Sequence, residues 1–476
     1  MLELGRIMTR PPENMFIYVA VAGTSMDPLT ACFRKSGHPI QALPLGQLSS
    51  PDLIKLAKVV VDTHKCPDLL YNRDFLRLLY DFGAIPRLAE RLFIELFGYL
   101  DKGVKHNDIP YNSIYSTLME VMRKMPQLRK GHALHLIKSI ITQDKVSASE
   151  GLPGTPTLTL GQLESTGEIV LSRSGTEYGT IEVPFPKLSS LLEQCEDVPV
   201  KHRLRDICTS VEGGQLIKTW QPFEYFVRDY DAVKELFTAD SIDKTCIIKD
   251  MYCASCNPAY SHLSVTLSSA VSTIAIRTRF PPLNSLIEGQ TCETFDYLST
   301  QYICKNAHGA PFDLFKVRCN NKGTSILMCF QVKLLQATKL SLSKLKAEVD
   351  KVRSSLAGTE FYDNHVLIVV ATSLADGIDD DDIPDRCYLI RPERFADFFT
   401  PTLANRAFLY SQGKRLSVNV ATREELEGLS DVSAGISSDI VSERRKRAFA
   451  DWDDLVARVK NIPLSIRSLV SFDPSI

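Results

Sequence analysis

Short apolar runs in the second half of the chain constrain its fold more than any other feature. Three runs follow one another closely, a helical spacing of apolar residues comes next at 341–356, and a fourth run ends the series: 301–304, 312–317, 325–335 and 365–371. Consecutive runs can pair as hairpins, whereas a strand after a crossover helix runs parallel to its neighbour. With a helix expected at 285–299 and a last strand and short helix at 387–399, this order predicts an α/β domain with a mixed sheet.

Polar residues lie on or at the edge of two of these expected strands. Asp313 is at the start of the second run, and Gln331 and Lys333 are near the end of the third. Because they are two positions apart in a strand, Gln331 and Lys333 project from the same face. A hairpin with a polar turn at 320–323 would bring them next to Asp313, and Glu293 lies on the helix expected before the strands. Oxygen ligands beside an ammonium group suit a divalent metal held against a phosphodiester.

The motifs around these residues resemble those of the restriction-endonuclease-like superfamily, PD-(D/E)xK. The helix motif GxxFE is matched by Gly289-Gln290-Thr291-Cys292-Glu293, with Cys in place of Phe. The PD element is matched by Phe312-Asp313 with the proline displaced to Pro311, and (D/E)xK is matched by Gln331-Val332-Lys333. The resemblance implies a nuclease-like domain over residues 217–410.

The same resemblance implies a chemistry. Glu293, Asp313 and Gln331 would hold Mg²⁺ (or Mn²⁺), which prefers oxygen ligands. Lys333 would orient the attacking water and stabilise charge on the transition state, which completes the expected catalytic set. Because Gln331 is neutral, we expect weaker metal binding than at a site with a third carboxylate. Because Gln331 cannot act as a base, the lysine or the metal would have to activate the water. The alternative is structural, with Asp313 facing solvent and Gln331 and Lys333 on the polar side of an edge strand.

The first hundred residues resemble the back end of a P-loop ATPase of the AAA+ or STAND type. An apolar run at 15–22 ends at Thr24 and Ser25, and Gly83-Ala84-Ile85-Pro86-Arg87 matches the Gly-x-x-Pro-Arg motif of the helical lid. No GxxxxGK[ST] sequence occurs in the chain, so a nucleotide would have no phosphate-binding loop. We therefore assign residues 1–104 to a truncated ATPase-like helical part and expect no nucleotide.

Residues 105–195 are expected to form a winged-helix-like domain. Helical spacing in its first part precedes two strand-like segments, 168–172 and 178–183, which favour a hairpin. Such a module can bind DNA or serve as a spacer. A polar linker at 196–216 follows, and a further helix is expected from Trp220 onward.

Residues 415–462 resemble a helix-hairpin-helix module, in which backbone amides of a glycine-rich hairpin hold a DNA phosphate. Thr422 is the expected N-cap of its first helix, and Asp431-Val432-Ser433 replaces the glycines. Basic residues at the end of the second helix could hold the DNA backbone without reading sequence. These residues are Arg444, Arg445, Lys446 and Arg447. The alternative is a solvated basic helix end.

Composition excludes several classes of protein. The formal net charge of -2 leaves no global basic field, so any contact with nucleic acid must come from local patches. No apolar run reaches the roughly 18–20 residues of a membrane span, and the N-terminus lacks the pattern of a signal peptide. The 12 cysteines suit a reducing compartment. The one close pair, Cys253 and Cys256, is weak evidence for zinc.

In this order, the four parts resemble the Crinkler effectors and retrotransposon-hot-spot proteins of eukaryotic pathogens. The resemblance implies a Mg²⁺-dependent endonuclease directed at nucleic acid, with DNA expected before RNA. It also implies a nuclear location, in the host nucleus if the protein is an effector. The alternative is a catalytically inactive member that binds DNA or protein. The sequence leaves the choice of DNA or RNA and the oligomeric state open.

Overall fold

The structure is a computed structural model that describes most residues between 48 and 472. The residues left out of this range are 49, 65, 67–68, 71, 84–85, 106–107, 124–130, 166–168, 174–177, 210–220, 240–244, 277–278, 282–297, 308, 334–338, 412–415, 420, 422, 428 and 430–431. The run at 15–22, Thr24, Ser25, Glu293 and Thr422 therefore lie outside the described residues. The described chain forms two compact units, one of residues 119–196 and one that combines residues 48–118 with 197–472.

The unit of residues 119–196 contains a small antiparallel sheet. Its strands β4 and β5 form a hairpin close to the predicted one, and β1 pairs with the other side of β5. Helix α7 packs against β5 and α9 and buries Leu136 and Ile140. The elements are α7 (His132–Thr142), β1 (Val146–Ser147), β2 (Gly151–Leu152), β3 (Thr155–Thr159), α8 (Leu160–Ser165), β4 (Val170–Arg173), β5 (Tyr178–Glu182) and α9 (Phe185–Gln194). The winged-helix assignment stays a prediction.

The second unit begins with a group of helices. They are α3 (Ser50–Thr63), α4 (Arg73–Phe82), α5 (Pro86–Leu100) and α6 (Tyr111–Arg123), the last of which continues into the first unit. Helix α4 begins at an Asn72 side-chain cap, whose Oδ1 accepts from the Phe75 amide at 3.0 Å. It packs against α14 (Phe395–Ser411), and the Asn405 amide donates to the Tyr80 carbonyl at 3.5 Å. These helices are therefore joined to the sheet domain that follows them in the chain.

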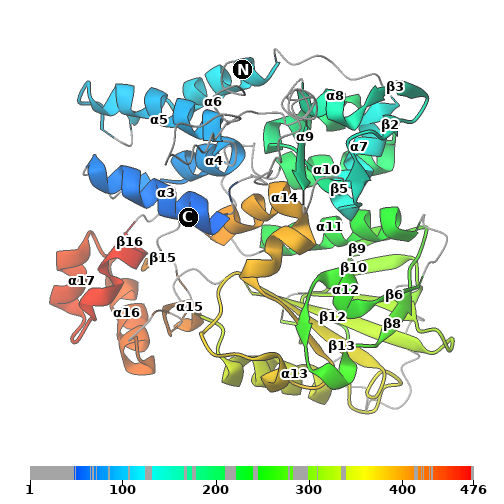
Figure 1. The fold of residues 1–476 in the computed structure, drawn as a ribbon. Helices are drawn as coiled ribbons and strands as arrows, with labels where there is room; N and C mark the ends of the chain where they lie inside the picture. Colours follow the sequence, from blue (N-terminus) through cyan, green and yellow to red (C-terminus); the bar gives the residue numbers. More distant parts are fainter. Residues whose placement is uncertain are drawn as a thin grey trace, which may run out of the picture. The chain divides into compact units, whose positions relative to one another are not determined.

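A mixed sheet forms the centre of this unit and confirms the expected α/β class (Figure 1). Its strand order is β6-β8-β11-β12-β13-β14-β7, and β10 pairs with β11 and β9. β12 is antiparallel to β11 and parallel to β13, as a crossover helix between β12 and β13 requires. The strands are β6 (Thr245–Ile247), β7 (Ser255–Cys256), β8 (Ser264–Thr266), β9 (Ser272–Ala275), β10 (Tyr302–Lys305), β11 (Leu314–Cys319), β12 (Ser325–Lys333), β13 (His365–Ala371) and β14 (Cys387–Ile390).

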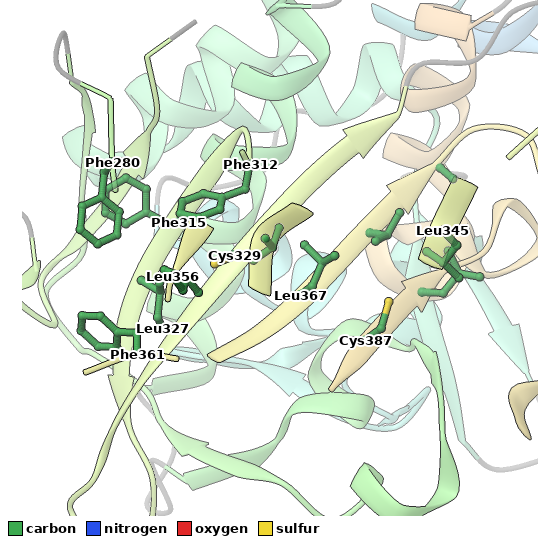
Figure 2. Close-up of a cluster of buried hydrophobic side chains, with 14 of the residues drawn as sticks. Phe280, Phe312, Phe315, Leu327, Cys329, Leu345, Leu356, Phe361, Leu367 and Cys387 are labelled. Carbon is green, nitrogen blue, oxygen red and sulfur yellow. The ribbon is translucent and has the colours of Figure 1, made fainter. Parts of the chain in front are cut away.

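Helices cover both faces of the central strands. The crossover helix α13 (Leu342–Ser355) packs on one face through a cluster that includes Phe315, Leu327, Cys329 and Leu345 (Figure 2). The other face meets α11 (Gln221–Ala239) and α12 (Ile248–Tyr252), and α14 packs on these two helices. The predicted polar linker at 196–216 is wrong over 198–209, where α10 (Val198–Thr209) is a helix that buries Leu204 and Ile207 and packs on α11. Burial of each large apolar side chain contributes about 1.5–3 kcal/mol, so the two layers hold the central strands in place.

The alternation of side chains along β12 decides which face carries its polar end. Leu327 and Cys329 belong to the cluster on the α13 side. On the opposite face, Phe330 makes an edge contact with the ring of Tyr252. Since alternate residues share a face, Gln331 and Lys333 continue the α13 side of the strand.

The C-terminal segment has a small core of its own. The core includes Leu426, Ile440, Trp452 and Leu455. The elements are β15 (Leu416–Ser417), α15 (Arg423–Glu427), α16 (Ala434–Lys446), α17 (Trp452–Arg458) and β16 (Val470–Ser471), and β15 pairs with β16 in parallel. Helix α16 begins at a Ser433 cap, so Ser433 serves the helix start. The helix-hairpin-helix assignment stays a prediction.

Across the described residues, no helix combines the length and the apolar character needed to cross a membrane.

Candidate active site

The hairpin of β11 and β12 brings Asp313 and Gln331 together. Leu314 pairs with Phe330, so the residue before β11 stands opposite Gln331. The Gln331 side-chain amide donates to Asp313 Oδ2 at 2.7 Å, and the Val332 backbone N–H donates to the same oxygen at 2.7 Å. The carboxylate is therefore held in one orientation by two donors from the neighbouring strand.

Lys333 ends β12 on the same face as Gln331 and meets a carboxylate from α13. Its Nζ lies 2.5 Å from Glu348 Oε1, and Glu348 Oε2 lies 3.3 Å from the Nζ of Lys351. The positive charges of Lys333 and Lys351 both act on Asp313. Asp313, Gln331 and Lys333 therefore lie close together, at the start of β11 and the end of β12.

A further carboxyl group, that of Glu224 in the first turn of α11, lies beside Asp313. Glu224 is buried and shares a hydrogen bond with Asp313. The Nζ of Lys305, at the end of β10, lies 2.9 Å from Glu224 Oε2. Two acids from distant parts of the chain thus meet beside one ammonium group.

Both acids hold their protons more tightly than usual. Burial, and then the negative charge of Asp313, raises the pKa of Glu224 to about 7, against the effect of Lys305. Asp313 is half-buried as a residue, but the desolvation of its enclosed carboxyl raises its pKa to about 6. The Val332 amide and the charge of Lys333 oppose that rise. Raised carboxyl pKa values of this kind are frequent at functional sites.

Two buried oxygens at this site have no hydrogen-bond partner among the described residues, and one of them, Glu224 Oε2, has the ammonium of Lys305 as an ion partner. The other has neither. It is Oε1 of Gln331, a side chain that is only 5% exposed. Buried acceptors are nearly always satisfied in proteins, so an unsatisfied one beside two acids indicates room for a donor or a cation. Gln331 thus fixes Asp313 with its nitrogen and leaves its oxygen free.

The Phe-Glu ending of the helix motif also occurs at Phe223-Glu224, with Trp220 in place of the motif's glycine, and the assignment of Glu293 stays a prediction. Glu293 lies outside the described residues. Glu224 follows Phe223, so it keeps the Phe-Glu ending of the GxxFE pattern, which Cys292-Glu293 does not. The start of the helix near Trp220 was expected, and the Phe-Glu pair within it was the available signal.

Asp313, Glu224 and Gln331 together offer two carboxylates and one amide oxygen. In the described part of the chain, no group of three or more His, Cys, Asp or Glu side chains is arranged to hold a metal ion. Among the residues that the structure describes, Cys253 and Cys256 belong to no such group. A metal at the candidate site would need the Gln331 oxygen as its third ligand.

Farther along α11, a second charged cluster faces β11. Asp231 and Glu235 lie 2.6 and 2.9 Å from Lys316 Nζ, and Glu235 also accepts from Arg318 Nε at 2.5 Å. Tyr252 donates to Asp231 at 2.8 Å. Although burial alone would raise it, the charges of Lys316 and Arg318 lower the pKa of Glu235 to about 2. This cluster is fully enclosed and fully paired.

The four basic residues of the C-terminal segment have different surroundings. Arg444 donates to the carbonyl groups of Val418 and Ala421 at 3.0 and 2.5 Å, so its guanidinium holds a turn of its own segment. The exposed residues after it also differ. Lys446 pairs with Glu443 at 2.6 Å, Arg447 pairs with Asp454 at 2.8 Å, and Arg445 is exposed. Arg444 therefore makes contacts within its own segment, whereas the next three residues are exposed, and DNA binding by the four residues stays a prediction.

Comparison of the chain with protein-family models, with curated proteins and with solved structures finds no match.

Proposed function

We propose that this protein is a metal-dependent endonuclease that hydrolyses phosphodiester bonds in nucleic acid. The observation that supports the proposal best is the meeting of Glu224, Asp313, Gln331 and Lys333 at one end of the mixed sheet. Two acids, an amide oxygen and an ammonium group are the functional groups that a metal-assisted cleavage of a phosphodiester needs.

The residues present fit a divalent cation of the Mg²⁺ or Mn²⁺ type. Glu224, Asp313 and the Oε1 of Gln331 would hold it, because all three offer oxygen and hard cations prefer oxygen ligands. The pKa values of the two acids are raised, and the Gln331 oxygen lacks a partner among the described residues. A bound cation would supply an activated water and polarise the scissile phosphate.

The side chains around the acids have separate tasks in this proposal. Gln331 Nε2 and the Val332 amide both bind Oδ2 of Asp313, which keeps the carboxylate from rotating. Lys333 would stabilise the negative charge that develops on the phosphate oxygens. Gln331 cannot accept a proton. The attacking water must therefore be activated by Lys333 or by the bound metal.

We propose DNA as the substrate and the nucleus as the place of action, as for the Crinkler and retrotransposon-hot-spot proteins that the order of segments resembles. The support is the order itself, in which a mixed-sheet domain precedes a C-terminal segment with three basic side chains at the end of one helix.

A second candidate is a catalytically inactive member of the same family that binds DNA or protein. The observation that favours it is the chemistry of the site: Gln331 stands where the motif has a carboxylate, and the pKa values of the remaining two acids are raised. Such a site would bind a cation weakly. The two candidate functions differ in whether the protein catalyses cleavage of nucleic acid.

Plasmid nicking tests the proposal. The intact protein should nick plasmid DNA with Mg²⁺ and not with EDTA, and Asp313→Ala and Lys333→Ala should each lower the rate by about 10²-fold or more. Mg²⁺ should also raise the thermal midpoint of the intact protein and not that of Asp313→Ala. Equal nicking by all three proteins would discard the site.

A matched pair of glutamate variants identifies the helix acid. Glu224→Gln should lower nicking and remove the Mg²⁺-dependent shift of the midpoint, whereas Glu293→Gln should change neither. The reverse result would return the metal ligand to Glu293.

A further inference from the structure

Glu348 stands between two lysines at the candidate site. Its Oε1 is 2.5 Å from Lys333 Nζ, and its Oε2 is 3.3 Å from Lys351 Nζ. Each carboxylate oxygen therefore serves one ammonium group. Both lysines also act electrostatically on Asp313, so the two cations and the acids belong to one site.

The spacing of α13 explains how Glu348 reaches this place. Leu345 and Val352 are fully buried in the cluster on this face of the sheet. Glu348 lies three residues after the first and four before the second, so it projects from the same side of the helix. That side meets the end of β12, where Lys333 lies. The side chain of Glu348 is 18% exposed and that of Lys351 is 47% exposed, so the group extends from the sheet toward solvent.

Stability alone gives little reason for a carboxylate at this position. Partly exposed ion pairs contribute at most about 1 kcal/mol. An apolar residue between Leu345 and Val352 would extend the buried stripe of the helix. What the carboxylate does instead is to hold two ammonium groups that would otherwise repel each other.

We propose that Glu348 is a positioning residue that holds Lys333 at the phosphate to be cleaved and Lys351 at a neighbouring phosphate of the same nucleic acid. The inference rests on the proposed function, because it assigns Lys333 to the reacting phosphate. Lys351 then adds one phosphate contact outside the reacting group. Such a contact releases a counterion and makes binding more sensitive to salt.

Variants of α13 in the full-length chain test this inference, each with a control on the same helix. Glu348→Ala and Glu348→Gln are compared with Asp350→Asn, and Lys351→Ala with Lys346→Ala, because Asp350 and Lys346 are exposed on other sides of the helix. kcat and KM come from plasmid nicking. Binding to a fluorescent DNA duplex is measured against salt in the Asp313→Asn background, which prevents cleavage.

The two kinds of variant should fail differently. Glu348→Ala should lower kcat at least about tenfold, and Glu348→Gln should recover part of it because the amide oxygen still accepts from Lys333. Lys351→Ala should raise KM with little change in kcat, and should reduce the slope of log K against log salt by about 1. Both control variants should behave like the intact chain.

The outcomes separate this inference from the proposed function. An unchanged kcat for Glu348→Ala, or a salt slope for Lys351→Ala equal to that of Lys346→Ala, would overturn the inference while nicking by the intact chain still stands. If the intact chain neither nicks nor binds DNA, the proposed function fails and the inference fails with it. Should Glu348→Ala not fold, Glu348→Gln and the exposed Lys351→Ala decide the result.

Discussion

Two charged clusters lie along helix α11, yet their charges are compensated to different degrees. Near the middle of the helix, Asp231 and Glu235 face Lys316 and Arg318, and burial of the group is complete. In its first turn, Glu224 meets Asp313 with Lys305 as an ion partner, while the ammonium of Lys333 is bound by Glu348. We call Asp231, Glu235, Lys316 and Arg318 the paired cluster. We call Glu224 and Asp313, with the lysines beside them, the acid cluster.

The difference appears in the proton affinities of the acids. In the paired cluster, cations and donors overcome burial, and the pKa of Glu235 is lowered to about 2. In the acid cluster, burial prevails, together with the charge of Asp313 on Glu224 and of Glu348 on Asp313, and the pKa values of Glu224 and Asp313 are raised to about 7 and 6. A buried cluster whose acidic and basic side chains are all paired has no need of a further ion. A buried cluster with more acidic groups than paired cations is suited to bind a cation.

The largest effect is expected from the paired cluster. Glu235→Gln should destabilise the protein by about 3–5 kcal/mol, because Arg318 would keep its charge in a buried place without a counter-charge and Lys316 would keep only Asp231 as a partner. Thermal or urea unfolding of the sheet domain measures this. A loss below about 1 kcal/mol would mean that water reaches the group and that the two clusters are alike.

Glu224→Gln should have the opposite profile. Nicking should fall by about 10²-fold, while the unfolding midpoint at pH 8 should stay equal or rise, because a charge that repels Asp313 is removed from a buried place. Activity and midpoint of the same preparation provide the measurement. A midpoint lowered as far as that of Glu235→Gln would show that Glu224 stabilises the fold and would remove the contrast.

The pH dependence of stability should separate the clusters by sign. Glu224 and Asp313 have folded pKa values above their unfolded ones, so the unfolded chain binds fewer protons and stability falls as pH rises from about 4 to 7. Glu235 has a lowered folded pKa, so its contribution is present above about pH 4.5 and is lost as pH falls toward 2.

The measurement is the free energy of unfolding between pH 4.5 and 7, without metal. The intact chain should lose on the order of 2 kcal/mol over this range relative to the double variant Glu224→Gln, Asp313→Asn. Parallel curves for the two proteins would show that the acids are solvated and not enclosed.

The smallest effect extends the contrast to the C-terminal segment. The guanidinium of Arg444 donates hydrogen bonds to carbonyl groups of its own segment, and that of Arg318 donates to the carboxylate of Glu235. Arg445, in contrast, is exposed. Arg444→Ala should cost about 1.5–3 kcal/mol of stability, and Arg445→Ala should stay within about 0.5 kcal/mol. If Arg445→Ala weakens DNA binding and Arg444→Ala does so only through unfolding, the exposed basic residues carry the contact.

Local patterns were enough to predict the hairpin at the candidate site. Strand periodicity and the polar turn indicated that Asp313 and Gln331 would be neighbours, and the hydrogen bond at 2.7 Å agrees with that expectation. The crossover helix likewise predicted the parallel pairing of β12 with β13. These features depend on residues close together in the chain, where spacing alone determines the geometry.

Local patterns could not predict which residues from distant parts of the chain contact the hairpin. Glu224 reaches Asp313, and Glu235 reaches Arg318, because α11 packs against a strand that follows it by about 80 residues. Arg444 turns toward its own backbone because the Val418 and Ala421 carbonyl groups need donors. The sequence by itself determined the strands and the crossover helix around the candidate site and which strand residues share a face, although it did not predict α10. Only the tertiary structure decided which distant charges meet, because that depends on how the helices pack on the sheet, and no local spacing encodes that packing.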